Sequence, residues 1–339
     1  MDARSLITQE SRRLGFAHLR VAAIGDAPEP CPRIEHLDSW LSAGRHADMD
    51  WIVRGRDVRA NPRLRGEAAR SAVVLSFEHH HQRPPDPGGL TGMVARYAWG
   101  RDYHNLVGKR LRKLLKRLRA AGIACWGGID TAPIFERAWA AEAGLGFQGK
   151  NALQIWPAGG SWMFLAVIFT EEPLVPDAPL GDHCGSCTRC LDACPTGALV
   201  GPGQLDARAC IAYWTIEARG AIPEALRPGF GRWVFGCDVC QEVCPHNVSP
   251  PEPDEDDLLP RNAWLDLEWL LTASDDAILA RFLGTPIRRP GPNGLRRNAA
   301  VVLGNLGDPA AASALRRVAD SGDPMVAEHA RWALDRLGV

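Results

Sequence analysis

The stretch CGSCTRCLDACP, residues 184–195, places four cysteines at 2-2-3 spacing and follows the last one with a proline. A second run, CDVCQEVCP at residues 237–245, repeats the end of this pattern with one cysteine fewer. Bacterial ferredoxins bind [4Fe–4S] clusters with the full pattern, and the fourth cysteine of a run there ligates the other cluster. The spacing therefore predicts a ferredoxin-like domain with two [4Fe–4S] clusters, in a protein that moves single electrons.

The second run lacks its first cysteine, because Val234 stands in that place. Cys210 lies between the two runs and is the cysteine in this region that is left to replace it. The crossed arrangement then completes two ligand sets. These are Cys184, Cys187, Cys190 and Cys244 for one cluster, and Cys194, Cys210, Cys237 and Cys240 for the other.

Two alternatives explain these runs less well. Structural zinc takes four ligands, often as two C-x2-C pairs, but it does not require a 2-2-3 run followed by proline. A disulfide framework needs an oxidising compartment, and residues 1–16 lack the apolar stretch of a secretory signal. The longest apolar run, residues 162–169, is far shorter than the ~20 residues that span a bilayer. We therefore expect a soluble, cytoplasmic protein that does not contact membranes.

Charge is nearly balanced along the chain as a whole. The net charge is −1, so that any contact with nucleic acid must come from local basic patches. One patch, residues 109–119 (KRLRKLLKRLR), has seven basic residues, although its leucines recur at the spacing of an ordinary helix with one solvated face. A second group lies in a Gly/Pro-rich segment near the C-terminus and consists of Arg288, Arg289, Arg296 and Arg297.

A chain of 339 residues is long enough for two or three domains. Apolar runs at 19–24, 72–77, 153–156 and 163–169 predict strands, and helical spacing predicts helices at 5–14, 34–42, 106–121 and 134–143. No G-x-G-x-x-G or Walker A motif is present, so neither dinucleotide binding nor a nucleotide phosphate loop is indicated. We expect an α/β domain over 1–175 and the ferredoxin-like domain over 176–250.

The C-terminal part differs in character from the rest. An acidic, proline-rich linker at 249–257 precedes it. Asp308-Pro309 and Asp323-Pro324 each place a capping Asp before a Pro at the first helical position. Three short helices, beginning near 295, 309 and 324, predict HEAT-type repeats over 259–339. Such repeats normally need three or more copies to be stable alone, so this part is expected to pack on the rest.

Several motifs resemble those of the epoxyqueuosine reductase family, and they occur in order along nearly the whole chain. They are MDWIVR (49–54), ARYAWGRDYH (95–104), GIDTAP (128–133), AGLGFQGKN (143–151), CIAYWTIE (210–217), GCDVCQ (236–241), IRR (287–289) and RNAAVVLGN (297–305).

This resemblance implies a function. The family reduces the epoxide of epoxyqueuosine, in the wobble position of certain tRNAs, to the alkene of queuosine, which is the last step of queuosine synthesis. It uses cobalamin and two [4Fe–4S] clusters, so that the first domain is expected to bind cobalamin and the C-terminal repeats to bind tRNA. An external electron donor is a further expected partner, and a monomer is the expected state.

The resemblance also implies roles for particular residues. Asp130 is expected to protonate the opening C–O bond, provided that burial beside the corrin raises the pKa of its carboxyl above the ordinary ~3.9. Without the resemblance, Asp130 is read as the N-cap of a helix that begins at Pro133. Cobalamin is expected to contact Arg54, Tyr97, Asp130, Asn151, Ser161, Trp214, Thr215 and Glu217. The tRNA backbone is expected to contact Arg288, Arg289, Arg296 and Arg297.

Two histidine-containing motifs are candidate metal sites, and neither predicts a metal ligand. Asp102-Tyr103-His104 nearly matches the D-x-H-x-x-G signature of histidine-ligated cobalamin, but Val107 occupies the glycine position. We therefore expect no bond between His104 and cobalt. Residues 79–81 are three successive histidines at a strand end, which cannot all face one ion and predict a polar loop.

Two other functions remain open at this stage. A cobalamin and iron–sulfur reductase of a small molecule, such as a dehalogenase, would not need the basic C-terminal repeats. An electron carrier fused to an RNA-binding module would need no cobalamin, and cobalt analysis separates it from the two enzymes.

Overall fold

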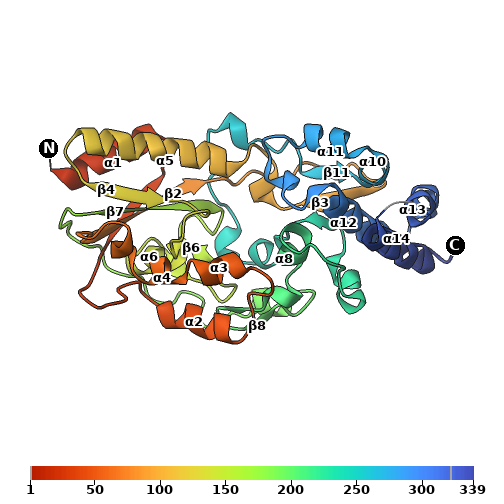
Figure 1. Cartoon of the computed structure of the whole chain (residues 1–339), viewed down its shortest axis with the longest axis horizontal. Coiled ribbons are helices and arrows are strands. Elements are labelled where there is room, and N and C mark those ends of the chain that lie inside the picture. The colour runs from red at the N-terminus through yellow and green to blue at the C-terminus, as the bar shows by residue number, and fades with distance from the viewer. Residues whose placement is uncertain (1, 321–322) are drawn as a thin grey trace.

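A four-stranded sheet forms the N-terminal part of the molecule in the computed structural model, which describes residues 2–320 and 323–339 (Figure 1). The strand order is β1-β2-β7-β4, and each neighbouring pair is antiparallel. The bounds are β1 (His18–Ala23), β2 (Ser71–Glu78), β4 (Cys125–Gly128) and β7 (Met163–Thr170). β2 and β7 are central and mostly buried, which explains why they read as nearly continuous apolar runs.

Helices cover both faces of this sheet. α1 (Ala3–Arg13) and α5 (Tyr103–Ala120) lie on one face, where the leucines of α5 join the core formed with β2 and β7. α2 (Ile34–Ser42) and α6 (Glu136–Glu142) belong to the core of the other face. The short α3 (Asp50–Arg54) and α4 (Arg56–Ala60) follow α2. Packing on an apolar sheet face accounts for the helical spacing seen in the sequence.

A second, three-stranded sheet joins segments that are far apart in the sequence. β3 (Thr91–Val94) lies between β10 (Trp233–Phe235), to which it is parallel, and β11 (Trp264–Asp266), to which it is antiparallel. The core around this sheet continues into the C-terminal helices. A strand from the predicted first domain thus pairs with segments from the other two, and the division of the chain into three domains stays a prediction.

The cysteine-rich segment and the hairpin that precedes it contain only short elements. The hairpin is β5 (Phe147–Gln148) with β6 (Gln154–Ile155), and the segment contains β8 (Leu199–Gly201) with β9 (Gln204–Leu205), α7 (Arg189–Asp192), α8 (Ile211–Ile216) and α9 (Val239–Glu242). The two cores in which Cys210 and Cys244 lie are small, with three buried residues each. Such a segment relies on bound metal or on its neighbours for stability.

The C-terminal part consists of helices that end at the opposite side of the molecule from the N-terminus (Figure 1). They are α10 (Leu267–Thr272), α11 (Asp275–Arg281), α12 (Gly291–Leu306), α13 (Ala312–Ala319) and α14 (Pro324–Leu337). Asp323 caps α14 by accepting from the amides of Met325 and Val326, as its position before a proline predicted. α10 and α11 were not predicted, and the HEAT-type repeat stays a prediction.

No helix in residues 2–320 and 323–339 is both long enough and apolar enough to span a membrane.

Candidate active site and cluster sites

Asp130 lies in a tight turn at the end of β4. A Cβ on Gly127 would lie 2.3 Å from the carbonyl oxygen of Val167, and one on Gly128 would lie 2.3 Å from Cβ of Ala132. These two glycines therefore let β4 pack closely before the chain turns. Asp130 itself has a φ of +26°, which is rare for a residue with a side chain and costs conformational energy. The turn leaves its side chain 56% exposed.

Two side chains from the start of α5 hold the Asp130 carboxylate. The Tyr103 hydroxyl donates to Oδ2 at 2.7 Å, and Nε2 of His104 lies 2.7 Å from the same oxygen. On the other side of the ring, Nδ1 of His104 lies 2.7 Å from Oδ1 of Asp102. Asp102 is also the N-cap of α5, so the helix start fixes the row Asp102–His104–Asp130.

The charges in this row differ from those expected from the sequence. Burial works to raise the pKa of Asp130, but the hydrogen bonds from His104 and Tyr103 outweigh it and lower the pKa below the ordinary value. Burial works to lower the pKa of His104, but its bonds to Asp102 and Asp130 raise it to about 9. At neutral pH the proton is therefore on His104, between two carboxylates. The rise in the pKa of Asp130 that its role as an acid was expected to require is not present in this structure, because His104, 26 residues away in the sequence, lies beside it as a cation.

Three aromatic rings pack against one another beside these groups. Tyr103 stacks on Phe164 of β7, with ring centroids 4.2 Å apart and planes 5° apart. Tyr97 packs edge-on against Tyr103 at 6.0 Å. Burial raises the pKa of Tyr97 well above its usual value, and its hydroxyl has no hydrogen-bond partner in the described part of the chain. Tyr97, a predicted cobalamin contact, thus lies beside the Asp130 cluster.

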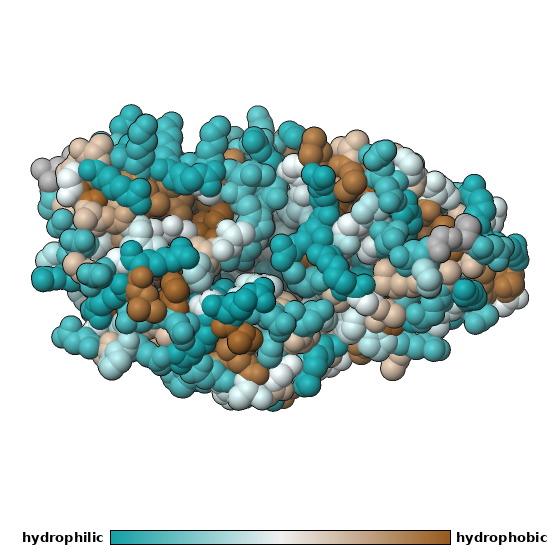
Figure 2. Space-filling model, viewed as in Figure 1, coloured by the Kyte–Doolittle hydropathy of each residue, from teal (hydrophilic) through white to brown (hydrophobic). Residues whose placement is uncertain are grey.

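An ion pair links α8 to the C-terminal part near the same place. The guanidinium of Arg289 donates to both carboxylate oxygens of Glu217, at 2.6 and 2.7 Å. Asp130 and Tyr103 are near enough for their charges to act on Arg289. Figure 2 shows the surface hollowed at the centre of this view, between the sheet with its helices and the C-terminal part. The structure therefore brings Tyr97, Asp130, Glu217 and Arg289 to one region.

Three other residues that were predicted to contact cobalamin are in different surroundings from Tyr97. Arg54 is exposed on α3. Asn151 is 4% exposed and donates to the carbonyl of Cys240, while Ser161 is 7% exposed and donates to Oε1 of Gln241. Asn151 and Ser161 thus hold the segment that carries the second cysteine run. Their contact with cobalamin stays a prediction, and their side chains already have structural partners.

Thr215 and Trp214 of α8 have structural contacts as well. Thr215 is fully buried, and its hydroxyl donates to the carbonyl of Ile211 and accepts from the amide of Gly236. Its side chain is occupied by these structural bonds, and its contact with cobalamin stays a prediction. The indole of Trp214 donates to the carbonyl of Arg208 and packs in two apolar cores, which agrees with a packing role.

The eight cysteines gather in two groups. Charges on Cys184 and Cys244 act on Cys190, and charges on Cys184 and Cys187 act on Cys244. In the second group, Cys210 and Cys194 act on Cys240, and Cys210 acts on Cys237. Cys190 of the first set also acts on Cys240, so the two groups lie near each other, and the crossed ligand sets stay a prediction.

Residues 2–320 and 323–339 contain no group of three or more His, Cys, Asp or Glu side chains that could hold a single metal ion. Burial raises the pKa of Cys210, Cys237 and Cys240. Metal would offset the cost of ionising these thiols.

The two groups differ in their access to solvent. The first run lies in a loop in which His183, Gly185 and Ser186 are exposed. Cys210 begins α8, and Cys237 follows the buried strand β10. We call the site of Cys194, Cys210, Cys237 and Cys240 the inner cluster site, and the site of Cys184, Cys187, Cys190 and Cys244 the outer cluster site.

The four predicted tRNA-binding arginines are not equivalent. Arg297 is fully buried and donates to the carbonyls of Trp214, Ala218 and Gly220. It cannot contact tRNA, and its prediction is wrong because helical spacing places it on the inner face of α12. Arg296 is largely buried and pairs with Asp275 at 2.6 Å. Arg288 and Arg289 are exposed.

Comparisons with known proteins cover the whole chain. Residues 183–247 match the model of a 4Fe-4S double cluster binding domain, and residues 59–131 match the model named Epoxyqueuosine reductase QueG, DUF1730. The epoxyqueuosine reductase of Xanthomonas campestris pv. campestris is 42% identical, across 100% of this chain and 97% of that protein. That of Pseudomonas aeruginosa is 39% identical, across 96% of this chain and 92% of that protein.

Solved structures of epoxyqueuosine reductases have the same fold as this chain. A crystal structure of epoxyqueuosine reductase with an epoxyqueuosine-modified tRNA-Tyr stem loop superposes with a TM-score of 0.90 at 29% identity, across 100% of this chain and 92% of that one. The enzyme from Streptococcus thermophilus gives a TM-score of 0.87 at 28% identity, across 99% and 90%.

Proposed function

This chain belongs to the epoxyqueuosine reductase family and acts on tRNA in the final step of queuosine synthesis, and we propose that it does so with a cobalamin bound beside Asp130. The observation that carries the proposal is the row Asp102–His104–Asp130, in which His104 lies between two carboxylates and the side chain of Asp130 is 56% exposed. The surface is hollowed between the sheet with its helices and the C-terminal part (Figure 2), and this is where the cofactor is proposed to bind.

The surroundings of Asp130 and the helix α3 both offer groups that suit a corrin ring. Tyr97 offers a flat ring that packs against Tyr103, and its hydroxyl has no hydrogen-bond partner among residues 2–320 and 323–339. Arg54 of α3 is an exposed donor for the amide groups at the corrin edge, and Trp51 on the same helix is 41% exposed. When bound, cobalamin supplies a cobalt centre that delivers electrons to the epoxide, and the double-cluster domain supplies those electrons one at a time.

The chain's own task is to deliver protons. Opening the epoxide and losing its oxygen as water consumes two electrons and two protons. His104 holds a proton between Asp102 and Asp130 at neutral pH. It passes this proton to Asp130 as the substrate displaces water from the carboxylate, and Asp130 donates it to the leaving oxygen. A proton held this close to the reacting bond is what general acid catalysis requires.

The tRNA backbone meets exposed basic side chains. Arg288 and Arg289 are exposed, Arg289 is near enough to Asp130 to feel its charge, and α5 leads away from His104 with an exposed basic face. That face consists of Lys109, Arg112, Lys113, Lys116 and Arg119. Phosphate contacts of this kind position an RNA helix without reading its sequence.

Metal analysis tests the cofactor assignment. Protein purified without oxygen and reconstituted with iron, sulfide and cobalamin is expected to hold about eight iron atoms and one cobalt per chain, because two four-iron clusters accompany one cobalamin. A tRNA bearing epoxyqueuosine should then yield queuosine in a single turnover. Queuosine formation by protein that contains iron but no cobalt would overturn the role of cobalamin.

Cys210→Ser tests the ligand sets. Cys210 belongs to the inner cluster site, so this variant is expected to lose about half of its iron and to keep the outer cluster. Cys125→Ser, at a free cysteine outside both runs, is the matched control. Full iron content and an unchanged spectrum in Cys210→Ser would show that the crossed assignment is wrong.

A further inference from the structure

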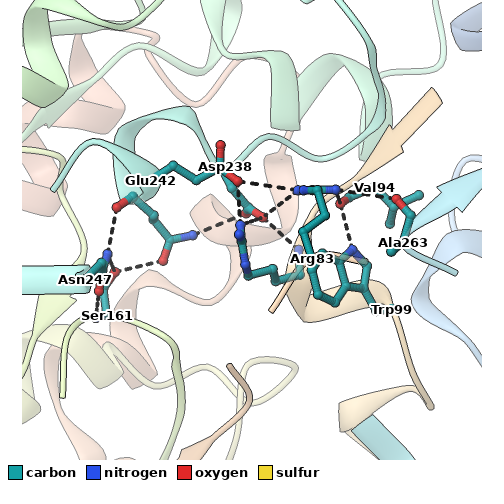
Figure 3. Close-up of polar contacts among 10 residues, drawn as sticks. Arg83, Val94, Trp99, Ser161, Asp238, Glu242, Asn247 and Ala263 are labelled. Carbon is teal, nitrogen blue, oxygen red and sulfur yellow. Dashed lines mark hydrogen bonds and ion pairs between the residues drawn. The ribbon is translucent and has the colours of Figure 1, made fainter. Parts of the chain in front are cut away.

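A buried network of charges lies against the loop of the inner cluster site. Asp238 stands between Cys237 and Cys240 in the sequence and is 2% exposed. Its carboxylate accepts from the backbone amide of Arg96 at 2.8 Å and pairs with the Arg96 side chain at 3.3 Å. Figure 3 shows Asp238 facing Arg83, whose guanidinium is 3.8 Å away.

Two arginines thus meet two carboxylates, of which Asp238 is buried and Glu242 is 36% exposed. Glu242, at the end of α9, pairs with Arg96 at 2.5 Å and with Arg83 at 3.5 Å. The side chains of Arg96 and Arg83 are 12% and 15% exposed. Because water screens these groups little, their charges act over longer distances than they would at the surface.

Tryptophan rings surround the two guanidinium groups. Arg83 lies 5.0 Å from the ring centre of Trp99 and 5.1 Å from that of Trp233, and Arg96 lies 4.7 Å from that of Trp162. Carbonyl groups of Val94 and Ala263 also accept from Arg83 (Figure 3). These contacts fix both cations in place, and they link the cluster loop to the strand β3.

The charge of Asp238 reaches the cluster ligands. Asp238 follows Cys237 directly and stands two residues before Cys240, in the same loop. Reducing a [4Fe–4S] cluster adds one negative charge and needs no proton, so a fixed negative charge nearby makes reduction harder and a fixed positive charge makes it easier. Net charge near a cluster is one of the factors that set its reduction potential.

We propose that Asp238, neutralised by Arg96 and Arg83, sets the reduction potential of the inner cluster. In this role the two arginines keep the potential from being driven down by the buried carboxylate, and electrons arriving from the outer cluster can settle there. These are positioning residues, since they touch the cluster loop and neither substrate nor cobalamin. The proposal rests on the ligand sets given under the proposed function.

Redox titration followed by electron paramagnetic resonance tests the proposal on the intact, iron-loaded chain. The midpoint that disappears in Cys210→Ser is assigned to the inner cluster. Arg96→Gln and Arg83→Gln are expected to lower that midpoint, because each leaves Asp238 less neutralised. Asp238→Asn is expected to raise it, because the two cations then face one carboxylate, that of Glu242, where they faced two. Opposite shifts from the two kinds of variant would not follow from simple loosening of the loop.

Controls separate charge from structure. Arg96→Lys keeps the charge and is expected to restore most of the midpoint. Arg110→Gln removes a partly buried arginine that pairs with Glu255 and lies over Phe77, away from the cluster loops, and should leave both midpoints unchanged. The outer cluster should move less than the inner one in every variant.

Two outcomes would overturn the proposal. The first is an unchanged inner midpoint in Arg96→Gln and Arg83→Gln when the iron content is full. The second is a shift of the same sign in Asp238→Asn and Arg96→Gln. If Cys210→Ser instead keeps both midpoints, the ligand sets themselves fail, which is a separate result from either of these.

Discussion

Asp130 and His104 come from two elements that are 26 residues apart in the sequence. The motif around Asp130 resembles that of a known family, so the sequence alone could select this residue. Its partner could not be found in that way, because only the packing of α5 against β4 places His104 beside it. The pattern Asp102-Tyr103-His104 is visible in the sequence. It resembles a cobalamin signature there, and nothing in the pattern itself indicates a proton relay to Asp130.

Asp130→Asn removes the acid and keeps the size of the side chain. The variant is expected to bind tRNA and to form queuosine about 10²–10⁴-fold more slowly, which is the usual contribution of a general acid. Single-turnover conversion of epoxyqueuosine-containing tRNA, with the reductant saturating, measures this. Turnover close to that of the unaltered enzyme would remove Asp130 from the mechanism.

His104→Gln removes the cation between the two carboxylates. The folded pKa of His104 is raised from 6.5 to about 9, so its contribution to stability is complete below pH 6.5 and is lost as the pH rises to about 9. The difference in Tm between the unaltered protein and His104→Gln should therefore shrink over this range. Thermal unfolding at several pH values measures it, and a difference that stays constant with pH would contradict the assigned charge.

The rate of queuosine formation should depend on pH through the protonation of His104. In the unaltered enzyme the rate is expected to fall as the pH rises through about 9, because His104 then loses its proton. In His104→Gln this decline should move to lower pH, since Asp130 must take its proton directly from solvent. An identical pH profile for the two proteins would show that His104 does not supply the proton.

At the scale of elements, long helices and strands followed from periodicity. The helix predicted at 34–42 coincides with α2, and the strand predicted at 163–169 differs from β7 by one residue. β4, β3, β10 and β11 have only three or four residues each, too few for a period to be visible. β4 also contains two glycines, which weaken strand propensity. The turn that presents Asp130 depends on this strand, so the site geometry could not be predicted.

Thr215 connects two short elements of the inner cluster site. Its hydroxyl bridges α8, which begins at Cys210, and Gly236, which precedes Cys237. Thr215→Val leaves the buried amide of Gly236 without a partner and is expected to lower the free energy of unfolding by about 1–3 kcal/mol. Urea denaturation under anaerobic conditions measures this, with Thr215→Ser as the control that keeps the hydroxyl. Unchanged stability together with weaker cobalamin binding would instead favour a ligand contact.

At the scale of the whole molecule, a group of basic residues in the sequence separates into different environments. Arg288 and Arg289 form a short turn before α12, while Arg296 and Arg297 lie within it and contact neighbouring elements. The sequence shows that the four arginines are close to one another along the chain. The hydrogen bonds of Arg297 in the structure show that its side chain lies between α12 and the carbonyl groups at and after the end of α8. The crossed cysteine sets could be inferred because cluster ligation follows fixed spacing, whereas RNA contact does not.

The contribution of each arginine to tRNA binding should therefore depend on whether its side chain is exposed to solvent. Replacing Arg288 and Arg289 together with Ala is expected to weaken tRNA binding and to flatten its salt dependence by about 0.7–0.9 in log–log slope for each lost phosphate contact. Arg296→Ala removes an arginine whose side chain is only 14% exposed and should leave the slope unchanged. Binding measured at several salt concentrations distinguishes the two. If the double variant keeps the full slope, the backbone contact lies elsewhere, and the exposed face of α5, beginning with Lys109 and Lys113, becomes the surface that carries it.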